Sequence, residues 1–306
     1  MAKYAVIDVG TNSIKFHIAE KGAEGKWSVV VDEANISRLG EGLQTTGNIS
    51  PEAMERNVSA VSEMAQKARE QRVNDIVAVG TMCLRTAKNA QEFVTRVKKT
   101  CDLTVEVIPG EEEARLAYLA VKSGIGLQEG RLVIFDTGGG STEFIFGQGD
   151  QIEKQFSLNV GAVRYTENTL CSDPVTQEEL EHAVVGIEKD FTDLKFEDKV
   201  DALVGMGGTV TNLSAVKHQL VKYDPDVIQG SVLELTEIER QITMYQAKTI
   251  AERREIAGLQ PKRADVILAG SLIVSVIMRK SGVDSFTVSD RGLRHGLMYD
   301  RFARNA

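Results

Sequence analysis

Two segments of the chain carry nearly the same pattern, and this duplication constrains the fold more than any other feature. Residues 5–16 read AVIDVGTNSIKF and residues 133–144 read VIFDTGGGSTEF. A constant offset of 128 residues superimposes four identical pairs: Asp8 on Asp136, Gly10 on Gly138, Ser13 on Ser141 and Phe16 on Phe144. Each copy is an apolar run ending in Asp, a turn rich in Gly, Ser and Thr, and a second apolar run. The pattern predicts a strand, a tight turn and a returning strand, formed twice.

The two turns are predicted to bind phosphate. A turn built from Gly, Ser and Thr can point several backbone N–H groups at one spot, which suits a phosphate. An Asp at the end of the preceding strand is well placed to hold Mg²⁺, directly or through water. For a single copy, a plain glycine hairpin with a solvated Asp would explain the pattern, but turn chemistry does not require the whole pattern twice. We therefore expect two half-sites that face each other across a cleft.

These turns supply most of the candidate site residues. In the first copy we expect phosphate contacts from the turn and the lysine after it: Gly10, Thr11, Asn12, Ser13 and Lys15. In the second copy we expect them from the turn alone: Gly138, Gly139, Gly140 and Ser141. The candidate metal ligands are acidic: Asp8, Asp136 and Glu143. Lys15 and Glu143 occupy the same position in the two copies, so a cation on one wall and an anion on the other fit phosphate binding opposite metal binding.

A third glycine cluster follows a further apolar strand. Residues 205–209 read GMGGT, come directly after the strand pattern at 200–204 and open a helical pattern. A helix N-terminus of this kind suits an anion or a nucleotide. The candidate phosphate-binding residues here are Gly207, Gly208 and Thr209. A plain turn between strand and helix explains the cluster equally well.

Composition excludes several classes of protein. The chain has 306 residues, 42% of them hydrophobic, and a net charge of −8 with both signs well mixed. A protein that coats nucleic acid would be basic, so we expect no nucleic-acid partner. Three cysteines without a C-x-x-C spacing argue against a disulfide framework and fit a reducing cytoplasm. No charged and apolar leader precedes Tyr4, and the apolar stretch at 264–278 is too short to span a bilayer, so no membrane partner is expected.

The order of the elements predicts an α/β protein with mixed sheets. Strand patterns occur at 3–9, 13–20, 26–34, 75–80, 103–108, 131–136, 142–147, 151–157, 201–206 and 284–288. Ser50, Pro51 and Glu52 form a clear helix start. Further helical patterns occur at 88–99, 111–123, 176–192, 209–220, 234–247, 261–280 and 290–303. We expect two related domains, 1–125 and 126–306, separated by the Gly-rich segment 123–130, with the helix at 290–303 near their interface.

Six motifs of the chain occur together in an order and spacing that one family shares. They are residues 8–13, Gly80-Thr81-x-x-Leu84-Arg85, residues 109–115 (PGEEEAR), residues 136–143, residues 205–209, and residues 289–296 (SDRGLRHG). In these motifs the sequence resembles the exopolyphosphatase / guanosine pentaphosphate phosphohydrolase (Ppx/GppA) family, over essentially the whole chain. The resemblance implies two ribonuclease-H-like domains of the actin-like, sugar-kinase and Hsp70 ATPase superfamily around a central cleft. It also implies the short, two-domain form of the family, since larger members append a C-terminal helical region.

The resemblance assigns roles to two further residues. Glu113 occupies the position of the family's catalytic glutamate, which implies a general base that deprotonates the attacking water; Glu112 is the alternative. Without the resemblance, three consecutive glutamates at a helix N-terminus are explained by the helix dipole. Arg85 is implied to contact the bound phosphate chain, which a guanidinium can hold bidentately. The four histidines show no metal-ligand spacing, and we interpret them as core or surface residues: His17, His182, His218 and His295.

The resemblance implies an Mg²⁺-dependent hydrolase that releases terminal orthophosphate from inorganic polyphosphate. Conversion of guanosine pentaphosphate (pppGpp) to the tetraphosphate is the further reaction it suggests. Glycine loops and Mg²⁺ would neutralise the phosphoryl group in transfer, and Glu113 would activate water. A sensor that binds polyphosphate or the guanosine alarmone, with vestigial hydrolysis, is the alternative from another class. We expect a cytoplasmic protein whose partners are these phosphate chains and, as a homodimer, a second copy of itself.

Overall fold

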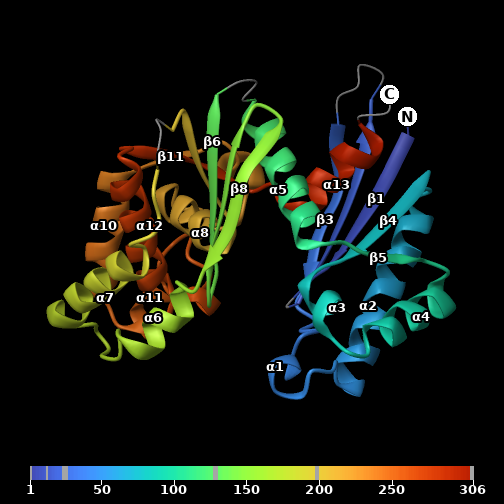
Figure 1. Ribbon diagram of the computed structural model, residues 1–306, viewed down its shortest axis with the longest axis horizontal. Coiled ribbons are helices and arrows are strands. Elements are labelled where there is room, and N and C mark those ends of the chain that lie inside the picture. The colour runs from blue at the N-terminus through green and yellow to red at the C-terminus, as the bar shows by residue number, and fades with distance from the viewer. Residues whose placement is uncertain (1, 12, 23–26, 127–129, 197–199, 304–306) are drawn as a thin grey trace. The chain divides into compact units, whose positions relative to one another are not determined.

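The protein folds into two compact units, each built on one β-sheet (Figure 1). The computed structural model describes residues 2–11, 13–22, 27–126, 130–196 and 200–303. Unit 1 consists of Met1–Ala120 together with Leu293–Ala306, and unit 2 consists of Val121–Gly292.

Unit 1 contains a five-stranded mixed sheet in the order β3-β2-β1-β4-β5. Its strands are β1 (Ala2–Val9), β2 (Ile14–Lys21), β3 (Trp27–Asn35), β4 (Asp75–Gly80) and β5 (Val105–Val107). The first three form an antiparallel meander, and β4 and β5 run parallel to β1. Side chains alternate along β1, so Ala5 and Ile7 enter one apolar cluster and Val6 enters another on the opposite face.

Helices cover both faces of this sheet. On one face lie α2 (Pro51–Glu70) and α4 (Ala90–Cys101), with the short helices α1 (Leu43–Thr46) and α3 (Met82–Thr86) nearby in the chain. On the other face Leu116 of α5 (Gly110–Ile125) and Leu297 of α13 (Leu293–Phe302) pack against Val6. Figure 1 shows the red helix α13 beside the blue strands, so the end of the chain returns to its beginning. The predicted start of α2 is confirmed: the Ser50 hydroxyl accepts a bond of 3.1 Å from the Ala53 N–H.

Unit 2 repeats the same sheet with one strand added. Its order is β10-β11-β9-β6-β7-β8, from β6 (Arg131–Thr137), β7 (Thr142–Gln148), β8 (Gln151–Leu158), β9 (Ala202–Met206), β10 (Val232–Glu234) and β11 (Ser285–Ser289). β6, β7 and β8 form the meander, and β9 and β11 run parallel to β6, as β4 and β5 run parallel to β1. The extra strand β10 pairs antiparallel with β11. The duplication predicted from the sequence is therefore confirmed in the topology.

The helices of unit 2 surround one large core. They are α6 (Ala162–Asn168), α7 (Gln177–Asp190), α8 (Gly208–Lys217), α9 (Pro225–Ile228), α10 (Leu235–Gln246), α11 (Ile250–Arg253), the 3₁₀ turn η1 (Pro261–Arg263) and α12 (Ile267–Ser281). α12 is buried on every side from Ile267 to Met278, which explains its unbroken apolar sequence. No described helix is both long and apolar enough to cross a membrane.

Two features differ from the sequence expectations. The helix expected at 261–280 begins only at Ile267, because residues 261–263 form a separate 3₁₀ turn that starts with Pro261. Residues 293–306 belong to unit 1 and not with residues 126–292, because Leu293 and Leu297 pack into the apolar cluster of the first sheet. Six short elements were not predicted, since three to seven residues carry too little periodic pattern: α1, α3, α6, α9, α11 and β10.

Candidate active site

The two duplicated turns have the same backbone hydrogen bond. The Gly10 N–H donates to the Ser13 carbonyl at 3.1 Å, and the Gly138 N–H donates to the Ser141 carbonyl at 2.9 Å. A Cβ atom on Gly10 would lie 2.8 Å from the Ser13 oxygen, so the turn requires glycine there. The sequence match at an offset of 128 is therefore also a match in conformation. Asn12, another residue expected in the first turn, lies outside the described residues.

Each strand-terminal Asp lies opposite the residue that differs between the copies. Asp8 pairs in register with Lys15, and Asp136 pairs with Glu143. The Lys15 Nζ atom is 3.8 Å from the Asp8 carboxylate. In unit 2 the Glu143 carboxylate instead accepts hydrogen bonds from the hydroxyls of Ser141 (2.5 Å) and Ser157 (2.9 Å). The contrast between a cationic and an anionic position is thus present at equivalent places in the two sheets.

In unit 1 the parallel strands bring the candidate residues to one edge of the sheet. Asp8 lies near the end of β1, Arg85 in the helix after β4, and Glu113 in the helix after β5. Because these strands run parallel, their carboxyl ends meet at the same edge. Burial raises the pKa of Asp8; the nearby charges of Lys15 and Arg294 oppose this rise, and that of Glu113 adds to it. These four charged side chains therefore share one electrostatic environment.

Arg85 contacts Glu113 directly. Its Nη1 atom donates to Glu113 Oε2 at 2.8 Å and to the Ile108 carbonyl at 2.9 Å. The Arg85 and Glu113 side chains are 27% and 36% exposed, so solvent and a ligand can reach both. The two residues implied by the resemblance are thus brought together, although 28 positions separate them in the chain.

Glu112 has different partners from Glu113. Both of its carboxylate oxygens accept bonds from Arg115, at 2.7 and 2.8 Å, and Arg115 also donates to Asp300 at 3.0 Å. The hydrogen bond with Arg115 is the largest cause that lowers the pKa of Glu112. Glu112 therefore belongs to an ion-pair network that joins α5 to α13, whereas Glu113 points to the Arg85 side.

In unit 2 the third glycine cluster lies against Asp136. Gly207 has a φ of +85°, and a Cβ atom there would collide with the Asp136 carboxylate, so two independent reasons require glycine. A Cβ on the next residue, Gly208, would collide with the guanidinium of Arg263. Burial lowers the pKa of Arg263, and the negative charge of Asp136 opposes that effect. A cation, a carboxylate and the N-terminus of α8 therefore meet at this edge of the second sheet.

The remaining residues of the second half-site divide into exposed and buried ones. Gly139 and Gly140 are exposed, and the carbonyls of Gly138 and Gly139 accept backbone N–H bonds from α6, which fixes the loop. Thr209, in contrast, is buried, and its hydroxyl donates to the Thr137 carbonyl at 2.8 Å. The bond ties α8 to the end of β6, so the Thr209 side chain has a structural partner already.

Comparison with known proteins identifies the family. Residues 17–305 match the model of the Ppx/GppA phosphatase family. The chain is 31% identical over 313 residues to exopolyphosphatase 2 of Mycobacterium tuberculosis, with 97% of this chain and 98% of the relative covered. This chain belongs to the Ppx/GppA phosphatase family.

Solved structures of the family agree with the fold. The Ppx/GppA phosphatase of Aquifex aeolicus superimposes with a TM-score of 0.91 at 35% identity, over 99% of this chain and 100% of that one. An exopolyphosphatase from Cytophaga hutchinsonii gives a TM-score of 0.81 at 27% identity, over 98% and 97% of the two chains. The fold is thus the expected α/β one, with two related domains that each contain a mixed sheet.

The chain also resembles a longer protein that is named as a pyrophosphatase and not as an exopolyphosphatase. The chain is 31% identical to the guanosine-5'-triphosphate,3'-diphosphate pyrophosphatase of Photobacterium profundum, over 98% of this chain and 59% of that protein. This Ppx/GppA chain therefore spans about three fifths of that relative's length and nearly the full length of the Mycobacterium tuberculosis relative.

The structure adds residues to the site that the sequence did not indicate. Arg263 lies in the 3₁₀ turn η1, which the sequence predicted only as part of a longer helix, so nothing indicated a contact with Gly208. Arg294 is part of the motif at 289–296, yet the motif alone suggested no contact with the region of Asp8. The interpretation of His17 as a core residue agrees with its burial. His17 and His295 lie together with Asp32 in a group whose atoms could hold a metal ion.

Proposed function

We propose that this Ppx/GppA protein hydrolyses a terminal phosphoanhydride bond of inorganic polyphosphate, with Glu113 as the general base that activates water. The observation that supports this proposal is that two neighbouring glutamates have different side-chain partners. Glu113 lies beside Arg85 at the sheet edge that also holds Asp8, whereas Glu112 is bound by Arg115. A base must be reachable by water and close to a group that positions the phosphate, and Glu113 meets both conditions.

Arg85 is suited to hold the terminal phosphate next to this base. Both of its hydrogen bonds to protein use Nη1, and a guanidinium has five N–H donors. A phosphate that binds the other side of the guanidinium would therefore lie close to the Glu113 carboxylate. The Gly10 N–H closes the first loop by its bond to the Ser13 carbonyl. The backbone N–H groups of Thr11, Asn12 and Ser13 and the Lys15 ammonium would neutralise further charge along the polyphosphate.

The second half-site is suited to a divalent cation and to further phosphates. Asp136 and Glu143 are cross-strand neighbours, and carboxylate oxygens are the ligands that Mg²⁺ prefers. The hydroxyls of Ser141 and Ser157 orient Glu143. When bound, Mg²⁺ would offset the negative charge of the phosphoryl group in transfer. Asp8 fits a ligand role less well, because its carboxylate is buried and already faces Lys15.

The phosphate contacts of the second half-site would come from the turn after β6 and from the start of α8. The Gly138 N–H closes the second loop by its bond to the Ser141 carbonyl, and Gly139, Gly140 and Ser141 would offer their backbone N–H groups. Gly207 and Gly208 begin a ten-residue helix whose dipole favours an anion. Arg263 lies over Gly208 and adds a guanidinium at the same place. Thr209 would act indirectly, through its bond to the Thr137 carbonyl.

Guanosine pentaphosphate is the second candidate substrate. It is favoured by the identity of 31% to the Photobacterium profundum pyrophosphatase, whereas the match over 98% of the Mycobacterium tuberculosis exopolyphosphatase favours polyphosphate. No observation favours the sensor that binds without hydrolysis. A cytoplasmic location and a homodimer remain predictions, which cell fractionation and light scattering on the purified protein test.

A direct assay tests the proposal. Orthophosphate release is measured from long-chain polyphosphate and from pppGpp, each with Mg²⁺ and with an excess of chelator. We expect Mg²⁺-dependent release from polyphosphate at a higher kcat/KM than from pppGpp. Binding of polyphosphate without any release of orthophosphate would contradict the proposal and support the sensor.

A further inference from the structure

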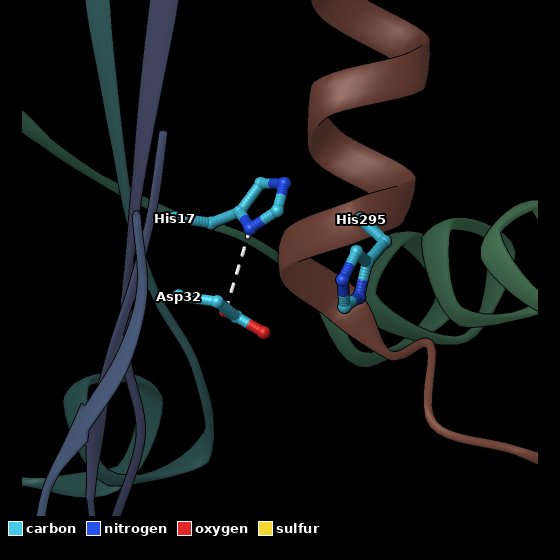
Figure 2. A group of neighbouring side chains, drawn as sticks. All are labelled: His17, Asp32 and His295. Atoms are coloured by element: carbon cyan, nitrogen blue, oxygen red, sulfur yellow. Dashed lines mark hydrogen bonds and ion pairs between the residues drawn. The ribbon is translucent and has the colours of Figure 1, made fainter. Parts of the chain in front are cut away.

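Two histidines from opposite ends of the chain meet on the α13 face of the unit 1 sheet. His17 lies on β2, and Asp32 lies directly opposite it on β3. His295 comes from α13, and its ring centroid is 4.8 Å from that of His17. Figure 2 shows the three side chains gathered between the strands and the helix. One potential ligand atom from each residue lies within 4.8 Å of the other two.

We propose that His17, Asp32 and His295 bind one divalent transition-metal ion, with Zn²⁺ as the best fit. Two imidazoles and a carboxylate are donors that suit Zn²⁺ and its neighbours in the first transition row, whereas Mg²⁺ prefers oxygen donors alone. This donor set differs from the carboxylates Asp136 and Glu143 of the proposed catalytic cation site. The two sites should therefore select different metals.

One ligand–ligand distance already matches that of a bound metal ion. With metal–ligand bonds of about 2.0–2.2 Å, neighbouring ligands of a tetrahedral site are separated by roughly 3.3–3.6 Å. His17 Nδ1 and Asp32 Oδ1 are 3.3 Å apart, which already matches one edge of such a tetrahedron. Cross-strand pairing in register fixes this edge, because both residues lie on a hydrogen-bonded ladder. All three ligand atoms lie within 4.8 Å of one another, and the His295 side chain would have to approach the other two for one ion to contact all three.

The Arg294 guanidinium is a positive charge beside the proposed metal site, where it contacts the ligand Asp32. Its Nε and Nη2 atoms donate to the two oxygens of Asp32 at 2.7 and 2.9 Å. Burial alone would raise the pKa of Asp32, but the hydrogen bonds from His17 and Arg294 hold it well below its usual range. A carboxylate has about four lone-pair sites, so Asp32 can accept these bonds and still bind a metal. Such outer partners commonly orient a ligating carboxylate. The guanidinium charge nevertheless opposes a cation, so we expect Zn²⁺ to bind more weakly here than it would without Arg294.

The site is accessible although one ligand is buried. The His17 side chain is 3% exposed, but the Asp32 side chain is 27% exposed, and His295 is half-buried. An ion can therefore enter from the Asp32 side. Once bound, it would join β2 and β3 to α13, the helix that brings the end of the chain back to unit 1. The expected effect of the metal is thus a gain in stability of unit 1.

The test uses the full-length protein after treatment with a chelator. Zn²⁺ is titrated by calorimetry, and Co²⁺ replaces it as a spectroscopic probe, because Co²⁺ with nitrogen and oxygen ligands in a tetrahedral site absorbs visible light. We expect one equivalent of Zn²⁺, visible Co²⁺ absorption, and a rise in Tm of roughly 5 °C at about 100-fold excess over the dissociation constant. Millimolar Mg²⁺ should leave all three results unchanged.

Matched variants assign the signal to these residues. His295→Ala and Asp32→Asn should each weaken Zn²⁺ binding at least tenfold and remove the Co²⁺ absorption. His182→Ala, which changes an exposed histidine of α7, should bind as the unaltered protein does. The proposal is overturned if the unaltered protein gives no Co²⁺ absorption, or if His295→Ala retains full Zn²⁺ affinity. Neither readout depends on hydrolysis, so the result stands apart from the proposed function.

Discussion

Arg85 Nη1 lies 2.8 Å from Glu113 Oε2, and this ion pair joins the helix after β4 to the helix after β5. The two strands are parallel neighbours, so the pair is fixed at the carboxyl edge of the first sheet. The adjacent Glu112 forms its ion pair with Arg115 instead. The side-chain partners thus distinguish two glutamates that the sequence left as alternatives.

Arg263→Ala should lower kcat by about 10²–10³-fold, because the variant loses a guanidinium beside Asp136 and the α8 N-terminus. Tm should change little, since Arg263 lies in a short 3₁₀ turn. Steady-state phosphate release and a thermal melt measure the two effects. Arg254→Ala is the control, because Arg254 is exposed in the same segment of the chain. Equal activity in the two variants would exclude Arg263 from the site.

Gly207→Ala should destabilise the protein by about 2–4 kcal/mol, because the methyl group meets both a positive φ and the Asp136 carboxylate. Gly230→Ala separates the two causes: Gly230 has a similar φ of +79° and open space around the added Cβ. That control should cost only about 1 kcal/mol. Urea unfolding of both variants gives the difference. Equal losses would show that Asp136 can move away from the glycine cluster.

Asp136→Asn and Glu143→Gln should each raise the Mg²⁺ concentration needed for half-maximal activity, because an amide oxygen carries no charge for the ion. Asp8→Asn should have a smaller effect on this concentration, since Asp8 is buried beside Lys15. Activity is measured against Mg²⁺ at saturating polyphosphate. An unchanged Mg²⁺ requirement in both unit 2 variants would show that these carboxylates serve the turn alone.

The sequence predicted the features of the fold and of the site that depend on local patterns of residues. The offset of 128 residues predicted both loops, and each loop closes with the same Gly-to-Ser bond. The sequence could not show that Arg263 covers Gly208 or that His295 reaches His17. Such contacts depend on long-range packing and leave no periodic signal. The sequence also suggested a phosphate contact for Thr209, whose hydroxyl the structure directs to the buried end of β6.

Cys83 should resist alkylation in the native protein although it lies two residues from Arg85. Burial raises the pKa of its thiol to about 11, so only about one part in a thousand is thiolate at pH 8. The rate of Cys83 alkylation should rise about tenfold per pH unit until the pH approaches the pKa of the thiol, because the thiolate is the reactive form. Cys171 is exposed and should react first. Mass spectrometry after brief iodoacetamide treatment measures the labelling of Cys83 and of Cys171. Labelling of Cys83 as fast as that of Cys171 would contradict the burial of Cys83.

Single-turnover hydrolysis of polyphosphate by Glu113→Gln and Glu112→Gln decides which glutamate is the general base. The glutamine at 113 is isosteric but accepts no proton at neutral pH, so turnover should fall by about 10²–10⁴-fold with polyphosphate affinity retained. Glu112→Gln should keep most of the turnover and lose some stability, because it weakens the pair with Arg115. Near-normal turnover in Glu113→Gln, with a large loss in Glu112→Gln, would contradict the assignment of the base.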